Sequence, residues 1–296
     1  MIETYVKEQA ANIRKGIGKS HGTFGELLQG VLPNNKDFLV TFPIKQFSEC
    51  EFISIPENDE LIVYPSNKYK SYQLAVKILN FFEKPIGGFL NLTSGIQQGK
   101  GLASSSADMI ATSKAIEDCF GINISVTLLE GFLREIEPSD GIMYPGVVVY
   151  YQREVKLREC VGNCPSLTVL ALDETGEVDT INFNQIEKPF TDTDKLKYQE
   201  LLDKAILAIK EDNLELLGEV TTRSTMLNQK LLPKKTLHPM LEICKQISGL
   251  GIVTAHSGTY IGILISNHDP AYKQKVETGL KQMKQLGYPV QLFHSV

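Results

Sequence analysis

The chain of 296 residues contains no tryptophan, only five cysteines and no long run of apolar residues. A helix that spans a membrane needs about 20 predominantly apolar residues, so no spanning segment is expected. The first residues, MIETYVKEQAANIRKG, also lack the apolar stretch of a secretory signal. Five scattered thiols do not form the disulfide framework that staples small secreted domains. These absences together predict a cytoplasmic protein with reduced cysteines and no membrane partner.

The chain also lacks an excess of positive charge. It has 30 Lys and Arg residues and 35 Asp and Glu residues, for a net charge of -5. A nucleic-acid-binding protein needs a basic patch to neutralise phosphates, so no nucleic-acid partner is expected. Hydrophobic residues make up 42% of the chain, which is enough to bury a sizeable core. The composition therefore favours an ordinary globular protein rather than a disordered one. The sequence does not determine the oligomeric state, although a homodimer is one expectation.

Hydrophobic periodicity predicts a mixture of strands and helices without strict alternation, which favours an α+β fold. Strands are expected at residues 38–42, 50–55, 61–64, 89–93, 146–151, 154–158, 167–172, 179–183, 260–266 and 290–293. Helices are expected at residues 71–82, 105–120, 126–136, 195–211, 214–228, 239–248 and 270–286, with Gly121 as the stop of the second. The composition shifts at GNCP, residues 162–165, which predicts two domains, 1–161 and 162–296.

The segment GIQQGKGLASSSAD, residues 95–108, carries the clearest chemical signal. It joins a predicted strand to a predicted helix, and Gly99 and Gly101 allow the backbone to turn tightly beside a ligand. Three serines, 104–106, then fall on the first helical turn, where unpaired N–H groups and the helix dipole favour a phosphate. Lys100 would add positive charge. The alternative is an ordinary surface loop with a serine cap.

Two better-known sites do not fit the sequence. A P-loop requires G-x-x-x-x-G-K-[ST], and residues 18–20 (Gly-Lys-Ser) supply its end, but Ile13 stands where the first glycine is required. A zinc site is not expected either, because no second ligand pair at the usual spacing accompanies Cys160 and Cys164.

Three segments resemble the motifs of the GHMP kinase superfamily, and they occur in the family's order. IQQGKGLASSSA, residues 96–107, resembles the second motif, P-x-x-x-G-L-G-S-S-A, with Gln97 in place of Pro and Ala103 in place of Gly. GTFGELLQG, residues 22–30, is similar to the first motif, and TAHSGTYIG, residues 254–262, to the third. The resemblance implies a two-domain α+β fold with an N-terminal ATP-binding domain, a C-terminal ferredoxin-like domain and an active site between them.

The resemblance also assigns roles in ATP and Mg²⁺ binding. The loop backbone would wrap the ATP phosphates at Gly99, Lys100, Gly101, Leu102, Ala103, Ser104, Ser105 and Ser106. Ser105 would also ligate Mg²⁺, and the family's second ligand is a Glu on the helix that precedes the catalytic Asp. Glu130 is the preferred candidate and Glu137 the alternative.

Asp140, in the segment PSDG, stands where these kinases place a catalytic base. It would accept or orient the proton of the substrate hydroxyl. The alternative is a simple turn residue, because Ser-Asp-Gly is common in turns. Many family members also carry a Lys five residues before the Gly-Glu pair, but here that position is Ser20, with Lys19 beside it. This departure puts lysine-assisted activation in doubt.

The first and third motifs would supply the substrate side of the site. The candidate substrate-binding residues are Thr23, Gly25, Glu26, His256, Ser257 and Gly258. Glu26 would bind a substrate ammonium group, although a buried structural Glu is the alternative. His256 is equally open to a structural role. Arg153 and Arg223 would suit a carboxylate, but nothing in the sequence distinguishes them from solvated surface residues.

Within the superfamily, the chain most resembles the L-threonine kinases of the cobalamin pathway. The similar segments are GTFGELLQG (22–30), EPSDG (137–141), DETGEVDTINFN (173–184) and AHSGT (255–259). The resemblance implies phosphorylation of the L-threonine hydroxyl by Mg-ATP to give O-phospho-L-threonine. Two alternatives remain open: a kinase for homoserine, serine or another hydroxylated amine, and a non-catalytic ligand sensor of the same fold.

Overall fold

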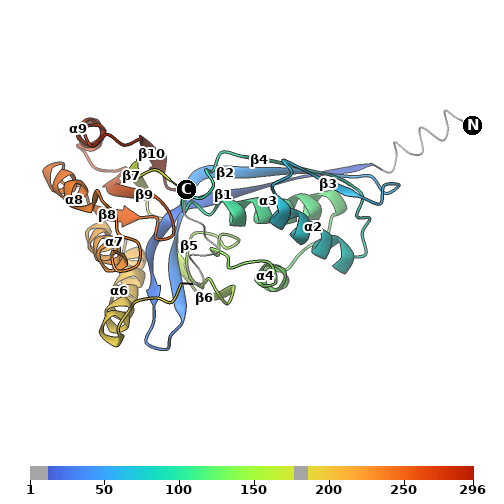
Figure 1. Cartoon of the computed structure of the whole chain (residues 1–296), viewed down its shortest axis with the longest axis horizontal. Coiled ribbons are helices and arrows are strands. Elements are labelled where there is room, and N and C mark those ends of the chain that lie inside the picture. Colours follow the sequence, from blue (N-terminus) through green and yellow to red (C-terminus); the bar gives the residue numbers. More distant parts are fainter. Residues whose placement is uncertain (1–12, 177–185) are drawn as a thin grey trace, which may run out of the picture.

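The computed structural model describes residues 13–176 and 186–296, which form one mixed structure of strands and helices (Figure 1). The described strands join in one ten-stranded sheet, in the order β10-β7-β9-β8-β1-β2-β4-β3, with β5 on β2 and β6 on β5. Strands and helices are mixed through both halves of the chain, so the predicted α+β class is confirmed. In these residues no helix is both long and apolar enough to cross a bilayer.

The helices and strands have the following bounds. The strands are β1 (Arg14–Val31), β2 (Asp37–Ser54), β3 (Leu61–Tyr64), β4 (Gly88–Ser94), β5 (Val147–Tyr151), β6 (Lys156–Gly162), β7 (Leu167–Asp173), β8 (Gly251–Thr254), β9 (Tyr260–Ser266) and β10 (Val290–His294). The helices are α2 (Tyr69–Phe81), α3 (Ser104–Phe120), α4 (Val126–Arg134), α6 (Asp192–Lys210), α7 (Leu214–Asn228), α8 (Leu237–Gln246) and α9 (Tyr272–Lys284). The strand predicted at 179–183 lies outside the described residues, and the boundary after residue 161 stays a prediction.

Strand β1 is the main element that the sequence did not predict. It pairs with β2 along its whole length, and its register shifts at His21/Gly22, Thr23/Glu26 and Glu26/Leu28. Bulges of this kind bend a strand. The irregular stretch coincides with the first motif, so the motif occupies the bend of the longest strand pair. Short β8, which was also missed, meets β1 there through the pair Glu26 and Thr254.

Two glycines explain why β1 escaped prediction and why α3 packs so closely on it. A Cβ at Gly16 would lie 2.1 Å from the carbonyl oxygen of Ala115, and one at Gly18 would lie 2.0 Å from that of Ala111. Glycine weakens a strand pattern in the sequence. Here it removes the side chains that would hold the helix away. Helix α3 ends at Gly121, which has a positive φ of 62°, as predicted.

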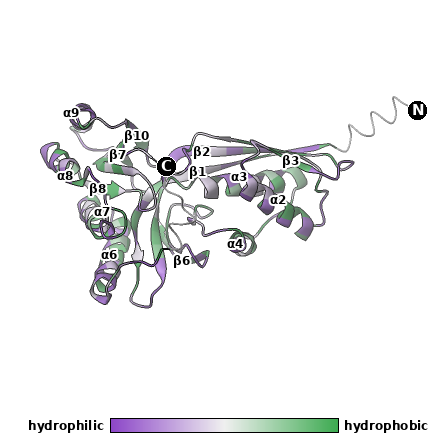
Figure 2. Ribbon diagram, in the orientation of Figure 1, coloured by the Kyte–Doolittle hydropathy of each residue, from purple (hydrophilic) through white to green (hydrophobic). Residues whose placement is uncertain are grey.

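Helices pack along the sheet in both halves of the chain (Figure 1). Helices α2 and α3 lie beside strands of the first half, and α4 packs on α2. Helices α7, α8 and α9 lie beside strands of the second half, and α6 packs on α7, β1 and β6. A main core runs through the first half and reaches α6 and α7. A smaller core fills the space between α8, α9 and strands β7 to β10, where β8 appears as a hydrophobic strand (Figure 2). These two cores hold in place the strands and helices that flank the motif loops.

Candidate active site

The glycine- and serine-rich loop lies between β4 and α3, as predicted. Gly99, Gly101 and Ala103 all have positive φ angles, of 68°, 75° and 57°, so the chain coils tightly before the helix begins at Ser104. No side chain in the described part of the chain caps this helix end. The first residues of the helix, Ser104, Ser105 and Ser106, line an open cleft. A helix N-terminus with free N–H groups is a favourable place for phosphate.

The first motif holds this loop from one side through its backbone. The amide of Thr23 donates to the carbonyl of Leu102 at 3.1 Å, and the amide of Gly25 donates to that of Gly101 at 3.0 Å. The backbone of Gly25 has a positive φ of 47°, and a Cβ there would lie 2.5 Å from the Cα of Ala255. Thr23 and Gly25 thus position the phosphate loop.

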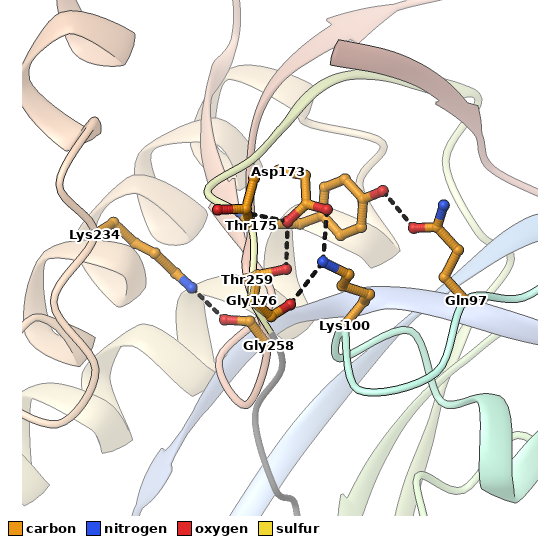
Figure 3. A network of polar contacts seen from close by, with 9 residues as sticks. Gln97, Lys100, Asp173, Thr175, Gly176, Lys234, Gly258 and Thr259 are labelled. Atoms are coloured by element: carbon orange, nitrogen blue, oxygen red, sulfur yellow. Dashed lines mark hydrogen bonds and ion pairs between the residues drawn. The ribbon is translucent and has the colours of Figure 1, made fainter. Parts of the chain in front are cut away.

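The third motif approaches the loop from the other side. A Cβ on Gly258 would lie 1.9 Å from the carbonyl oxygen of Lys100, so only glycine allows this approach. The ammonium group of buried Lys234 donates to the carbonyl of Gly258 (Figure 3). Burial lowers the pKa of Lys234 to about 8. The three motifs, distant in the sequence, are therefore in direct contact.

Lys100 is held by a polar network at this junction (Figure 3). Its Nζ lies 2.7 Å from Oδ2 of Asp173 and 2.7 Å from the carbonyl oxygen of Gly176. Thr259 donates its hydroxyl to Oδ1 of Asp173 at 2.5 Å. The positive charge of Lys100 is therefore engaged by the end of β7, so Lys100 ties the phosphate loop to the second half of the chain.

The cleft beside the loop collects most of the predicted site residues. Its empty volume, including the part open to solvent, is about 700 Å³. It is lined by Glu26, Gln29, Gly99, Gly101, Leu102, Ala103, Ser104, Ser105, Ser106, Glu137, Pro138, Asp140, Gln152 and Ser257. Residues from all three motifs and from the PSDG segment therefore face one space.

Asp140 is one of the residues that line this cleft. The hydroxyl of Ser106, on the first turn of α3, donates to its Oδ2 at 2.8 Å. Burial raises the pKa of Asp140 to about 7, and the neighbouring charges of Glu26 and Glu137 act in the same direction. A carboxyl group with a pKa near neutrality, beside a phosphate cradle, is suited to exchange a proton with a substrate hydroxyl.

Glu137 contacts the serine that was expected to ligate Mg²⁺. The hydroxyl of Ser105 donates to Oε1 of Glu137, and the ammonium group of Lys70, from the first turn of α2, pairs with Oε2. A serine hydroxyl and a carboxylate are hard oxygen donors, the type that Mg²⁺ prefers, and the ion keeps several waters besides. Ser105 and Glu137 therefore fit Mg²⁺.

Glu130, the preferred metal ligand from the sequence, has a different environment. It is buried on α4, and its Oε1 accepts hydrogen bonds from Tyr144 Oη at 2.9 Å, Tyr150 Oη at 3.0 Å and the amide of Leu157 at 3.1 Å. It does not line the cleft. These three donors hold its carboxylate within the protein, which favours Glu137, the alternative from the sequence, as the candidate metal ligand.

Glu26 and His256 form a buried pair at the other side of the cleft. His256 Nδ1 donates to Oε2 of Glu26 at 2.9 Å, and its Nε2 lies 2.8 Å from the hydroxyl of Ser224 on α7. Both residues are buried. Glu26 lines the cleft, while His256 stands behind it. His256 therefore acts on the site through Glu26, whose carboxylate it orients.

The remaining candidates lie away from the cleft or outside its chemistry. Ser20 is buried and Lys19 pairs with Glu49 on an exposed surface, so neither replaces the family's first-motif lysine. Arg153 pairs with Asp37, and Arg223 with a glutamate one helical turn away. Neither arginine is among the residues that line the cleft.

Sequence reasoning missed three residues that the structure brings to the site. They are Gln29, Gln152 and Lys70. The sequence offered a signal for Gln29, because it lies three residues after Glu26 in the first motif. Gln152 follows β5 and Lys70 begins α2, and neither carries a sequence signal of chemistry.

Comparison with known proteins gives a consistent assignment. Residues 72–146 match the family model of the GHMP kinases N terminal domain. The chain is 25% identical to an L-threonine kinase of Citrobacter freundii, over 84% of this chain and 86% of that protein. It is also 25% identical to an L-threonine kinase of Salmonella typhimurium, over 83% of this chain and 82% of that protein.

Solved structures share the fold at low sequence identity. A homoserine kinase from Cytophaga hutchinsonii matches with a TM-score of 0.72 and 13% identity, over 96% of this chain and 95% of that one. A mevalonate kinase from Methanococcus jannaschii matches with a TM-score of 0.68 and 19% identity, over 96% and 98%. The matched N-terminal domain, the shared fold and the three contacting motifs agree in making this chain similar to the GHMP kinases.

Proposed function

We propose that this protein is a kinase that transfers the terminal phosphoryl group of ATP to the hydroxyl of L-threonine. One observation carries the proposal: Ser106, on the helix turn that would cradle phosphate, donates its hydroxyl to Asp140 at 2.8 Å. A phosphoryl donor at the α3 terminus and a hydroxyl at Asp140 would therefore be neighbours. Phosphoryl transfer depends mainly on such positioning and on charge stabilisation.

Asp140 is proposed as the group that receives the proton of the acceptor hydroxyl. Its pKa of about 7 leaves a substantial ionised fraction at neutral pH, and that fraction is able to accept a proton. The amides at the start of α3 would stabilise negative charge on the transferred group. Lys70 adds a positive charge beside Glu137, and it also lines a second hollow shared with Ser104 and Ser105.

Ser105 and Glu137 are proposed to hold Mg²⁺. When bound, the ion neutralises charge on the phosphate chain. Glu137 contacts Ser105 through one carboxylate oxygen, so the two residues proposed to coordinate Mg²⁺ already lie close together. Thr23, Gly25 and Gly258 would act by fixing the loop.

The identity of the acceptor rests on relatives and on Glu26. Two L-threonine kinases match most of the chain, and a carboxylate faces the cleft where an amino acid would present its ammonium group. Homoserine and serine share both groups and are the alternative acceptors. The missing first-motif lysine keeps a ligand sensor as a second candidate, because Ser20 occupies that position.

ADP release with Mg-ATP tests these alternatives on L-threonine, L-serine, L-homoserine, ethanolamine, galactose and mevalonate. We expect turnover with L-threonine well above the rest. Preferred turnover of another acceptor would keep the kinase and change its substrate. ATP binding without turnover of any acceptor would contradict the kinase proposal and favour the sensor.

A further inference from the structure

Three of the residues that line the cleft carry hydrogen-bond acceptors. They are Glu26, Gln29 and Gln152, and Asp140 lines the same cleft. Of the described residues that line the cleft, none is Lys or Arg, and Lys188 lies in the adjacent hollow that Gln29 also lines. A bound substrate would therefore meet carboxylate and amide groups in this lining.

Two of these acceptors lack partners. Gln152 is 5% exposed, and its Oε1 is buried without a hydrogen-bond partner in the described structure. The Oε1 of Gln29 is buried and unpartnered in the same way. A buried carbonyl that neither protein nor water satisfies is costly, and such groups are uncommon in folded proteins. The terminal torsion of each amide is soft, so rotation can turn its Oε1 toward the cleft. A donor bound in the cleft would then satisfy that oxygen.

Glu26 is oriented for the same purpose. Its Oε2 accepts from His256, which is fixed in turn by Ser224 on α7. All three side chains are buried, so Glu26 is held in one position at the edge of the cleft. The carboxylate and the two amides are three acceptors that line the same cleft as Asp140.

We propose that Glu26, Gln29 and Gln152 form a binding subsite for a primary ammonium group of the phosphate acceptor. The enzyme would then select 1,2-amino alcohols by their ammonium group rather than by a carboxylate. An ammonium group has three N–H donors and no acceptor, which matches the three acceptors. With the ammonium here, a hydroxyl on the adjacent carbon is directed to Asp140. The inference rests on the proposed kinase function and adds to it the group that the enzyme recognises.

Matched acceptors test this selection on the unmodified enzyme. L-Threonine amide keeps the ammonium and hydroxyl groups but lacks the carboxylate, whereas 3-hydroxybutyrate keeps the carboxylate and hydroxyl but lacks the ammonium. We expect kcat/KM for L-threonine amide within about tenfold of L-threonine, and for 3-hydroxybutyrate at least 100-fold lower, about 2.7 kcal/mol. The reverse order would overturn the subsite. If L-threonine itself were inactive, the proposed function would fail instead.

Gln152→Met and Gln29→Met test the residues. Each removes one acceptor, and each should raise the KM for L-threonine about tenfold while leaving the KM for ATP unchanged. Gln282→Met is the matched control, because Gln282 on α9 also has a buried, unpartnered Oε1 but lies outside the cleft lining. An unchanged KM for L-threonine in both cleft variants, with the unfolding temperature preserved, would refute the assignment. If a variant failed to fold, the acceptor comparison would still decide.

Discussion

The residues at the start of α3 and the acceptor residues Glu26, Gln29 and Gln152 differ in hydrogen-bonding character, and this difference suits them to ligands of opposite charge. The amides and serine hydroxyls of the first turn of α3 are donors beside the cleft, and Lys70 adds positive charge from the neighbouring hollow. Glu26, Gln29 and Gln152 supply acceptors to the cleft. In the proposed function a triphosphate would lie beside the first group and an ammonium group beside the second.

Removing the central carboxylate should have the largest effect. Asp140→Asn keeps the shape but cannot accept a proton, so we expect kcat to fall by about 10²–10⁴-fold with little change in ATP affinity. In the unmodified enzyme, kcat/KM for the acceptor should rise as pH increases through about 7, because the ionised Asp140 is the active form. Steady-state kinetics from pH 5.5 to 9 would measure both. Full turnover by the variant would remove Asp140 from the mechanism.

The same substitution should raise stability. The pKa of Asp140 is above its ordinary value of 3.8, so the folded chain binds this proton more tightly than the unfolded chain. Ionisation therefore lowers the free energy of unfolding progressively from about pH 4 to pH 7, where the loss becomes constant. Asp140→Asn should then be more stable by on the order of 1 kcal/mol at pH 8, with a smaller gain near pH 4. Denaturant unfolding at the two pH values checks the sign.

Glu137 and Glu130, the two candidate metal ligands, differ in their surroundings, and substitutions should separate their roles. Glu137→Ala should weaken Mg²⁺ binding at least about tenfold and lower activity at limiting Mg²⁺, since it removes a proposed ligand. Glu130→Ala should leave the Mg²⁺ dependence unchanged but lower the free energy of unfolding by about 1–3 kcal/mol, because three donors lose their acceptor. Magnesium titrations and denaturant unfolding of both variants separate the roles. If Glu130→Ala weakened Mg²⁺ binding and Glu137→Ala did not, Glu130 would be the metal ligand instead.

A smaller effect is expected where the third motif touches the phosphate loop. Gly258→Ala places a Cβ 1.9 Å from the carbonyl oxygen of Lys100, so the loop must shift. We expect the KM for ATP to rise about tenfold or more, since small displacements of positioning groups are expensive in catalysis. Gly131→Ala is the control, because no atom lies within 4 Å of its added Cβ in α4. That control should keep the KM and gain up to about 1 kcal/mol in stability. Unaltered ATP kinetics in Gly258→Ala would show that the contact does not position the loop.

Individual helices and strands could be predicted from the sequence where residue preferences agreed with the structure. Helix α3 and its stop at Gly121 follow from apolar spacing and a left-handed glycine, and β9 follows from a continuous apolar run. Strand β1 was not readable, because Gly16 and Gly18 look like loop residues until α3 is placed against them. Packing between distant segments supplies the reason for those glycines.

The site was readable in part. The order of three motifs identified the phosphate loop, and the structure brings all of them together around Lys100 and Gly258. The sequence could not separate Glu130 from Glu137, since both are carboxylates near Asp140. Their hydrogen-bond partners decide, and those partners come from residues as distant as Lys70 and Leu157.

By itself, then, the sequence determined the mixed fold, the superfamily resemblance and the loop at the start of α3, because glycine, serine and apolar spacing act locally on the backbone. Only the tertiary structure decided that Lys100 is bound to Asp173, that Glu130 lies within the protein, and that Gln29 and Gln152 face the cleft. The physical reason is that a side chain's role depends on burial and on its partners. Both are set by segments that are far apart in the chain and meet only when it folds.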